Sequence, residues 1–249
     1  MYADYRPAGD LLKDRIVLVT GAGDGIGRAA ALAYAAHGAT VVLLGKTVPK
    51  LEAVYDEIES DGGATPAIYP MHLEGATPHD YDELAKAMDS NFGRLDGILH
   101  NAASLPYLSR IKDYEADDWL KVMQVNLNAP FFMTQACLPL LDKSDDASVL
   151  FTTDRVGHVG TAFWGAYGVS KFGIEGLTQI LAAELEKGNI RVNCIDPGPT
   201  RTGLRKRAFP GEDNATLKAP ETLAPLYLWA MGPDSRGTTG QRLSWEDQG

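Results

Sequence analysis

The stretch Thr20-Gly21-Ala22-Gly23-Asp24-Gly25-Ile26-Gly27 joins a run of apolar residues to an alanine-rich segment. Gly21 allows a sharp backbone turn, Gly25 lets the backbone approach a pyrophosphate, and Gly27 lets a helix pack closely on a strand. The first N–H groups of the following helix carry a partial positive charge that attracts phosphates. The stretch therefore predicts a nucleotide-binding turn between a strand and a helix; the alternative is a tight turn without a ligand.

Short runs of apolar and β-branched residues recur along the chain and alternate with longer helical segments. Ile16-Val17-Leu18-Val19 is apolar on both faces, as in a central parallel strand covered by helices. With right-handed crossovers, this alternation predicts an α/β fold: a single Rossmann-type domain over residues 1–249, with a doubly wound parallel sheet of about seven strands. The predicted strand segments are Arg15–Thr20, Thr40–Leu44, Pro66–Met71, Leu95–Asn101, Ser148–Thr153, Ile190–Ile195 and Gln241–Ser244.

Several segments between these strands predict helices with recognisable ends. Gly27–His37 is followed by Gly38, a residue that favours the end of a helix. In Thr77-Pro78-His79-Asp80, the threonine suits the N-cap, the proline the first helical position and the aspartate the third. The other two predicted helices are Asp117–Leu141 and Trp164–Lys187, the second closed by Gly188.

Composition limits the classes of partner. The chain carries 23 Lys and Arg against 33 Asp and Glu, a formal net charge of −10, without a Lys/Arg-rich block. This balance argues against binding to nucleic acid or to an anionic membrane. No apolar stretch approaches the roughly 20 residues that span a bilayer, and the polar N-terminal residues do not form a signal peptide. Because the two cysteines, Cys137 and Cys194, lie in apolar segments, we predict a cytoplasmic protein with reduced thiols.

The choice of nucleotide is expected to depend on the end of the second strand. A carboxylate there binds the ribose hydroxyls of NAD and repels the 2′-phosphate of NADP. This chain has Gly45 followed by Lys46, and an ammonium without a carboxylate favours NADP. Asp24 argues for NAD, and Lys46 is also compatible with an ordinary surface lysine. The residues favour NADP and leave NAD open.

Tyr167 and Lys171 lie four residues apart on a predicted helix, so both side chains emerge on one face. A phenol has an unperturbed pKa of about 10. A neighbouring ammonium, together with an oxidised nicotinamide, stabilises the phenolate and lowers that pKa. Tyr167 can then give a proton to a developing alkoxide or remove one from an alcohol. By itself, the pair is also typical of an ordinary helix surface.

These patterns together resemble the short-chain dehydrogenase/reductase family, whose fingerprint is Thr-Gly-x-x-x-Gly-Ile-Gly and whose Tyr-x-x-x-Lys lies in the fifth βα unit. Asn101-Ala102-Ala103 resembles the family's Asn-Ala-Gly, with an alanine in place of the glycine. Asn126 matches the family's helix asparagine. Finer matches resemble the YciK-type bacterial branch; they are Trp164-Gly165-Ala166-Tyr167, Arg191-Val192-Asn193-Cys194-Ile195, Ala208-Phe209-Pro210 and Pro225-Leu226-Tyr227-Leu228-Trp229.

The resemblance implies roles for particular residues. Tyr167 would be the proton donor, Lys171 its activator, and Asn126 the residue that holds a water on the proton path. His72 stands where the family often has an aspartate that binds the adenine amino group. The implied cofactor-binding residues are Gly21, Gly23, Asp24, Gly25, Ile26, Gly27, Lys46, His72, Asn101, Ala102, Tyr167, Lys171, Pro197, Gly198, Thr200 and Thr202.

One catalytic position departs from the family pattern. The family has a serine thirteen positions before the tyrosine, and its hydroxyl donates to the substrate carbonyl; here that position is Asp154. An ionised carboxylate only accepts hydrogen bonds and repels an alkoxide. Four interpretations stay open: Asp154 is protonated and donates, Thr153 supplies the hydroxyl, the site is impaired, or Asp154 pairs with Arg155 or another cation at the surface.

The resemblance implies an NAD(P)-dependent oxidoreductase that acts on a small molecule, reducing a carbonyl or oxidising an alcohol by hydride transfer. The alternative is a nucleotide-binding, catalytically impaired protein that acts as a cofactor sensor or interaction module. The histidines show no metal-ligand spacing, so no metal site is predicted. The segment Thr200–Pro220 is expected to cover the substrate pocket, and its arginines favour an acidic or polar substrate.

The family also implies a homodimer or homotetramer, formed through the long helices that hold Asn126 and Tyr167. Four glycines on the second of these helices would allow close packing between copies. They are Gly165, Gly168, Gly173 and Gly176.

Overall fold

Seven parallel strands form one sheet in the order β3-β2-β1-β4-β5-β6-β7 in the computed structural model, which describes residues 2–245. Met1 and residues 246–249 of the predicted 1–249 domain lie outside the described residues. The predicted doubly wound α/β fold is confirmed. The strands are β1 Ile16–Thr20, β2 Thr40–Gly45, β3 Ala67–Pro70, β4 Gly97–His100, β5 Ala147–Thr152, β6 Ile190–Asp196 and β7 Arg242–Ser244.

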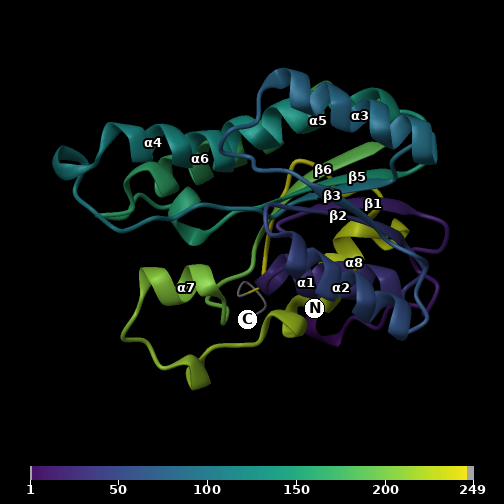
Figure 1. Cartoon of the computed structure of the whole chain (residues 1–249), viewed down its shortest axis with the longest axis horizontal. Coiled ribbons are helices and arrows are strands. Elements are labelled where there is room, and N and C mark those ends of the chain that lie inside the picture. The colour runs from purple at the N-terminus through teal and green to yellow at the C-terminus, as the bar shows by residue number, and fades with distance from the viewer. Residues whose placement is uncertain (1, 246–249) are drawn as a thin grey trace.

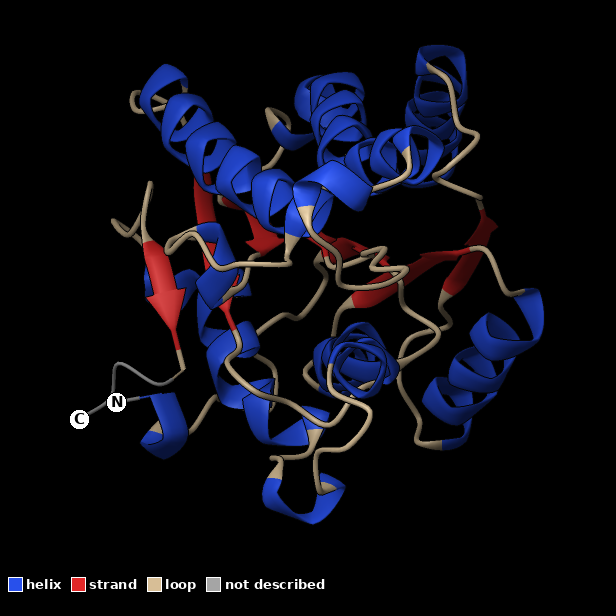
Figure 2. Cartoon of the chain, turned by 90° about the vertical axis from the view of Figure 1, so that its left-hand side faces the viewer, coloured by secondary structure: helices blue, strands red, loops and turns tan. Residues whose placement is uncertain are grey.

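Helices cover both faces of this sheet. In Figure 1, α3, α4, α5 and α6 lie on one face and α1, α2 and α8 on the other, and Figure 2 shows the sheet between the two helical layers. The helices are α1 Gly25–Ala36, α2 Val48–Ser60, α3 Pro78–Phe92, α4 Ala116–Met123, α5 Ala129–Leu141, α6 Gly165–Glu184, α7 Gly203–Ala208 and α8 Ala224–Met231. None of these helices has both the length and the apolar content needed to cross a membrane.

The two-sided burial of β1 explains its unbroken apolar sequence. Val17 and Val19 pack into the core cluster that includes residues of α1, α2 and α8, whereas Leu18 packs into the cluster that includes residues of α3, α5 and α6. All three side chains are fully buried. Burial of one such side chain contributes about 1.5–3 kcal/mol, so both faces of the strand stabilise the fold.

The prediction of a single helix over Asp117–Leu141 is wrong. The structure has α4, then a π-helical turn at Gln124–Asn128, then α5. The turn lies directly before Pro130, which has no N–H to donate to the carbonyl four residues earlier. The wider turn carries Asn126, whose side chain is buried against the site.

Other differences concern helices that were not predicted and the ends of elements. Helix α2 buries Leu51, Val54 and Ile58 on one face, a helical spacing that was present in the sequence. The short helices α7 and α8 were not predicted either. Helix α1 begins at Gly25 rather than Gly27, because the carboxylate of Asp24 accepts the first free N–H of the helix.

The strand order places the site. Strand β1 lies between β2 and β4. From β1 the chain continues to β2 on one side, and from β4 it continues to β5 on the other side. In open parallel sheets, a crevice forms at the carboxyl ends of strands where the order reverses in this way. The glycine-rich turn after β1 and Asn101 after β4 both lie at this edge.

Candidate active site

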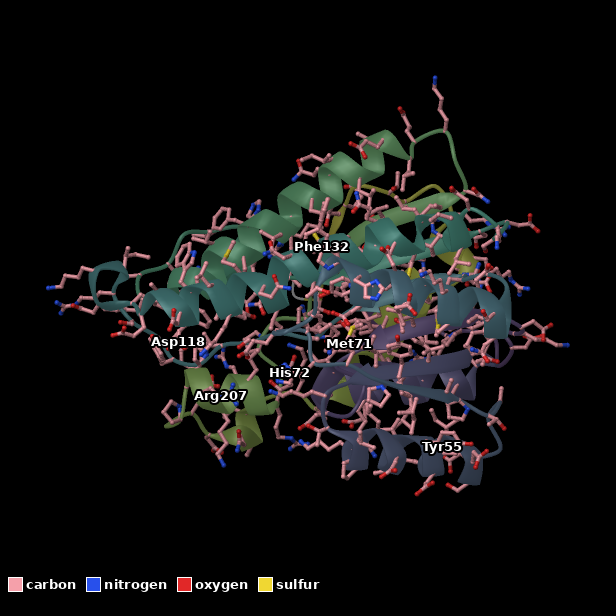
Figure 3. The ribbon with its side chains drawn as sticks, turned by 45° about the horizontal axis from the view of Figure 1, so that its top comes forward. Tyr55, Met71, His72, Asp118, Phe132 and Arg207 are labelled. Carbon is pink, nitrogen blue, oxygen red and sulfur yellow. The ribbon has the colours of Figure 1, made fainter. Side chains whose placement is uncertain are left out.

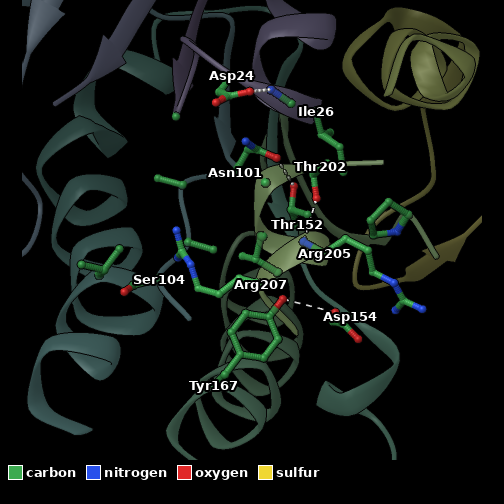
Figure 4. A pocket seen from close by; sticks show the side chains of 18 of the residues that line it. Asp24, Ile26, Asn101, Ser104, Thr152, Asp154, Tyr167, Thr202, Arg205 and Arg207 are labelled. Carbon is green, nitrogen blue, oxygen red and sulfur yellow. Dashed lines mark hydrogen bonds between the residues drawn. The ribbon is translucent and has the colours of Figure 1, made fainter. Parts of the chain in front are cut away.

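A cleft of about 790 Å³ runs along the carboxyl edge of the sheet. The glycine-rich turn lines it at one end and Tyr167 at the other, as Figure 4 shows with Asp24 and Tyr167 at opposite ends of the pocket. Gly27 and Asn126 are not among its lining residues, and they lie behind its wall. The other predicted cofactor-binding residues line the cleft, namely Gly21, Gly23, Asp24, Gly25, Ile26, Lys46, His72, Asn101, Ala102, Tyr167, Lys171, Pro197, Gly198, Thr200 and Thr202.

The glycine-rich turn requires glycine for two different reasons. Gly21 and Gly25 have φ angles of +68° and +52°, which side-chain-bearing residues rarely adopt. At Gly27, an added Cβ would lie 2.3 Å from the carbonyl oxygen of Gly21 and 2.6 Å from Nδ2 of Asn101. The turn therefore brings backbone amides to the cleft in a shape that suits a pyrophosphate, as predicted from its sequence.

Charges at the edge of this turn suit an anionic group. Asp24 caps α1 by accepting the Gly25 N–H at 2.7 Å, and its carboxylate also pairs with Lys50. The hydrogen bond from Lys50 lowers the pKa of Asp24, so this carboxylate is ionised but compensated. Lys46 lines the cleft and has no ion-pair partner within residues 2–245. The sequence analysis missed Lys50, although its position four residues after Lys46 was a usable signal.

The adenine end of the predicted site is formed by the segment after β3. Met71 and His72 both line the cleft, and Figure 3 shows them on the connection that leaves the sheet there. An imidazole can accept a hydrogen bond in place of a carboxylate. His72 therefore has the position that the resemblance implied for it.

The end of β4 is tied to the strands on both sides. Thr20 Oγ1 accepts hydrogen bonds from the N–H groups of Asn101, at 3.0 Å, and Ala102, at 3.1 Å. Thr152 Oγ1, at the end of β5, donates to Oδ1 of Asn101 at 3.3 Å. These bonds hold three strand ends together at the middle of the cleft.

Asn126 clamps the loop that follows β4. Its Oδ1 accepts the Ser104 N–H at 2.7 Å, and its Nδ2 donates to the Ser104 carbonyl at 3.0 Å and to Ser170 Oγ at 3.1 Å. The loop is thereby fixed to α6, the helix that carries Tyr167. Sequence reasoning missed Ser104 and Ser170, because nothing in the local sequence connects them to Asn126.

Tyr167 and Lys171 lie side by side on α6, as predicted. Lys171 Nζ is 5.5 Å from the centre of the Tyr167 ring and donates to the Thr152 carbonyl at 2.6 Å. Burial lowers the pKa of Lys171 to about 8, although the Asp154 carboxylate acts in the opposite direction. Burial and Asp154 raise the pKa of Tyr167 well above 10. The predicted lowering of this pKa is therefore wrong for the protein groups alone, because burial and a nearby carboxylate both disfavour a phenolate.

Asp154 lies in the cleft and contacts Tyr167 directly. Its Oδ2 accepts the Tyr167 O–H at 3.2 Å, and its Oδ1 accepts the Val156 N–H at 3.1 Å (Figure 4). Among residues 2–245 it forms no ion pair, so the interpretation of Asp154 as half of a surface ion pair is wrong; Arg155 is exposed and also lines the cleft. Thr153 lines the cleft, but its buried hydroxyl donates to Glu175 at 3.0 Å, so supplying a hydroxyl to a substrate would require a shift of this loop and stays a prediction.

Part of the segment predicted to cover the substrate pocket, Thr200–Pro220, lines the cleft, between Thr200 and Phe209; its role toward a substrate stays a prediction. Arg205 makes a two-point ion pair with Glu212, at 2.6 and 2.7 Å, and its guanidinium lies 3.9 Å from the ring centre of Phe209. Arg207 donates to the Leu105 carbonyl at 3.0 Å. The arginines that favoured an acidic substrate are therefore held by groups of the protein itself.

Comparison with known proteins agrees with this geometry. The model of the short chain dehydrogenase family matches residues 15–213. The chain belongs to the short-chain dehydrogenase family. It is 50% identical over 236 residues to the uncharacterized oxidoreductase YciK of Escherichia coli K12, covering 95% of this chain and 93% of that protein.

Two solved relatives of this short-chain dehydrogenase contain the nucleotide. A protein from Shigella flexneri 2a, complexed with NADP, superposes with a TM-score of 0.93 and 49% identity over 95% of this chain and 99% of that one. A protein from Escherichia coli CFT073, complexed with NADPH, superposes with a TM-score of 0.93 and 50% identity over 96% of this chain and 99% of that one.

Three of the four glycines of α6 in this short-chain dehydrogenase pack closely against groups of the same chain. An added Cβ at Gly165, Gly168 or Gly173 would meet Tyr114, Trp164 or Leu127, at 2.8, 3.3 and 2.8 Å respectively. Only Gly176 of the four has no atom within 4 Å. Close packing of these glycines against another copy stays a prediction.

Proposed function

We propose that this protein is an NADP-dependent oxidoreductase that reduces a carbonyl group or oxidises an alcohol by hydride transfer. The placement of Tyr167 and Lys171 in the same cleft as the glycine-rich turn carries this proposal. Lys46, at the end of β2, supports NADP over NAD because an ammonium attracts the 2′-phosphate. The NADP and NADPH complexes of the two solved relatives support the same choice.

The residues of this chain divide the work between binding and proton transfer. The amides after Gly21 hold the pyrophosphate, and the nicotinamide, when bound, supplies or accepts a hydride. Tyr167 turns its O–H from Asp154 toward the substrate oxygen and gives up the proton. Lys171 places positive charge beside the phenol ring and stabilises the anion that remains. Asn126 keeps the Ser104 loop in place along one wall.

The first test is nucleotide binding followed by turnover. A fluorescence titration is expected to give tighter binding of NADPH than of NADH. NADPH consumption is then measured with a panel of ketones, aldehydes and quinones, for the natural protein and for Tyr167→Phe. The variant keeps the ring and loses the proton, so we expect NADPH still to bind and the rate to be lowered at least about a hundredfold. Absence of NADPH binding overturns the proposal.

A second candidate is a nucleotide-binding protein with little catalysis, which acts as a cofactor sensor or interaction module. The hydrogen bond from Tyr167 to Asp154 favours it, since the proton donor is engaged by a carboxylate where the family uses a hydroxyl. The two candidates separate in Asp154→Ser: if NADPH is bound by both forms and only the variant turns over, the second candidate is correct.

We also propose that two copies associate through α4, α5 and α6 in the cytoplasm. Five large apolar side chains on these helices are at least two-fifths exposed, an unusual amount of apolar surface for neighbouring helices. Both cysteines are free and buried, which suits a reducing compartment. The exposed side chains are Leu120, Phe131, Val169, Phe172 and Ile180.

A further inference from the structure

Asp154 brings a negative charge without a direct ion-pair partner to the reacting end of the cleft. Two other carboxylates that line the cleft are paired, Asp24 with Lys50 and Asp196 with Arg242. Asp154 has no cation within ion-pair distance in the chain from residue 2 to 245. Each of its oxygens accepts one hydrogen bond, from Tyr167 and from Val156, and a carboxylate has lone pairs for further donors.

The cations near Asp154 make other contacts. Lys171 donates to the Thr152 carbonyl, Arg205 is paired with Glu212, and Arg207 donates to the Leu105 carbonyl. Arg155 also lines the cleft but is exposed, and Asp154 acts on Lys171 without forming an ion pair with it. Figure 4 shows Arg207 on the opposite side of Tyr167 from Asp154. A cation that enters with the substrate would therefore be the first to pair with Asp154 directly.

This charge favours one kind of reducible bond over another. When a carbonyl is reduced, charge on its oxygen goes from neutral to negative, and a carboxylate opposes this change. When a protonated imine is reduced, charge on its nitrogen goes from positive to neutral, so the carboxylate attracts the substrate and still attracts the transition state. Relative to the free substrates, Asp154 thus disfavours the carbonyl and favours the protonated imine, and this advantage arises in binding rather than in the hydride step itself.

The wall beside Asp154 also suits a flat cation. Trp164 lines the cleft, with its ring centre 5.5 Å from that of Tyr167 and 5.9 Å from that of Phe209. Aromatic faces attract delocalised cations within about 6 Å. This attraction is independent of the charge on Asp154.

We propose that the preferred substrate of this site has a carbon–nitrogen double bond and binds as a protonated imine whose N–H donates to Asp154. This inference rests on the NADP-dependent hydride transfer of the proposed function and replaces its carbonyl substrate by one with a C=N bond. In the step, a hydride with its electron pair passes from a reduced nicotinamide to the imine carbon. The π pair of the C=N bond becomes the nitrogen lone pair, an amine forms, and the nicotinamide becomes its oxidised cation. No proton moves in this step, because the nitrogen already carries one.

The binding test needs no turnover. Calorimetric titration of the protein, without a hydride donor, compares 2-methyl-3,4-dihydroisoquinolinium, a permanent iminium cation that carries the charge but no N–H, with 1-tetralone, a neutral ketone of similar shape. This pair tests the charge attraction alone, and the cation is expected to bind at least about tenfold more tightly. Asp154→Asn keeps the shape and removes the charge, and should abolish this preference. Asp145→Asn, an exposed carboxylate at the other end of β5, is the matched control and should leave the preference unchanged.

The kinetic test uses NADPH with 3,4-dihydroisoquinoline and 1-tetralone. We expect the imine to have the higher kcat/KM, and Asp154→Asn to raise its KM at least about tenfold with a smaller change in kcat, since the charge acts mainly on binding. Asp154→Ser should instead favour the ketone. A melting temperature for each variant shows that it is folded, and the two different substitutions guard against one failing to fold.

The outcomes separate this inference from the proposed function. If the protein consumes NADPH with ketones, and Asp154→Asn leaves iminium binding and imine kinetics unchanged, the imine preference is overturned alone. If the iminium binds through Asp154 but NADPH neither binds nor is consumed, the proposed function fails. Tighter binding of tetralone than of the iminium to the natural protein also overturns the imine preference.

Discussion

The hydroxyl of Tyr167 donates a hydrogen bond to Oδ2 of Asp154 at 3.2 Å. The two residues come from different elements: Tyr167 lies on α6, and Asp154 lies in the loop after β5. The bond directs the proton of the phenol at a carboxylate, and the same carboxylate raises the pKa of the phenol. Proton transfer from Tyr167 to a substrate therefore begins with the loss of this bond.

Replacing Asp154 by serine is expected to raise kcat/KM for ketones. A serine hydroxyl can donate to the substrate oxygen, and one such donor contributes about 10²–10³ in rate in other enzymes. Because the geometry here was formed around an aspartate, we expect a gain of at least about tenfold. NADPH consumption with 1-tetralone measures it, and an unchanged or lower value contradicts the prediction.

Replacing Lys46 by alanine is expected to weaken binding of NADPH and to leave NADH unaffected. We propose that the ammonium attracts the 2′-phosphate, which NADH lacks, so its loss should raise the Kd for NADPH about tenfold. Fluorescence titration with both nucleotides measures the effect. Lys187→Ala, an exposed lysine after α6, is the control. Equal losses for the two nucleotides would show that Lys46 does not distinguish them.

Burial of Lys171 makes stability depend on pH. Its pKa is about 8 in the folded protein against 10.5 for an ordinary lysine, so between these pH values the unfolded chain binds more protons. The free energy of unfolding therefore rises with pH through this window, by about 3 kcal/mol for this group. Guanidinium unfolding from pH 7 to 10 should show this rise in the natural protein relative to Lys171→Met. Parallel curves for the two proteins would contradict it.

Gly27→Ala is expected to disrupt the nucleotide site, although Gly27 does not itself line the cleft. The new methyl group would lie 2.3 Å from the Gly21 oxygen and 2.6 Å from Asn101 Nδ2, so the turn and β4 must move apart. We expect a loss of about 1–3 kcal/mol in the free energy of unfolding and at least tenfold weaker NADPH binding. Gly160→Ala, where an added Cβ meets no atom within 4 Å, serves as the control. Normal stability and NADPH binding in Gly27→Ala would refute the prediction.

A charge on the exposed face of α6 should separate the copies. Phe172 and Ile180 are 45% and 60% exposed, and we propose that association covers them. Phe172→Glu would then bury an unpaired carboxylate, at a cost of several kcal/mol, and shift the protein to monomers. Light scattering after size-exclusion chromatography measures the mass. If the natural protein is itself a monomer at micromolar concentration, the proposed assembly is wrong.

Local patterns predicted the parts of the fold that depend on local physics. The capping arrangement at the start of α3 is one case: the Thr77 N–H donates to the Asp80 carboxylate at 2.7 Å, as their spacing predicts. The positive φ angles of Gly21 and Gly25 are another. Helix α2 was missed although its apolar spacing is helical, because its many charged residues obscured the buried face.

Other features depend on contacts between distant segments. The sequence around Asn126 shows no break between the helical patterns before and after it, so the π-helical turn was not predicted. The side chain of Asn126 bonds to Ser104, in the loop after β4, and to Ser170, on α6. Nothing in the neighbouring sequence predicts these bonds. The contacts of the α6 glycines within the chain were not predicted for the same reason, since Tyr114 and Leu127, which pack on two of them, are far away along the chain.

The sequence by itself determined the sheet, the glycine-rich turn, the Tyr167–Lys171 pair and the presence of a carboxylate at position 154. These follow from apolar spacing, backbone freedom and helical periodicity, which act over a few residues. Only the tertiary structure decided what the carboxylate does. Its partners, Tyr167 and Val156, and its lack of a cation, depend on how α6 packs against the end of β5. The burial of a side chain and the charges around it depend on all the segments packed at the site, and these segments meet only in the folded chain.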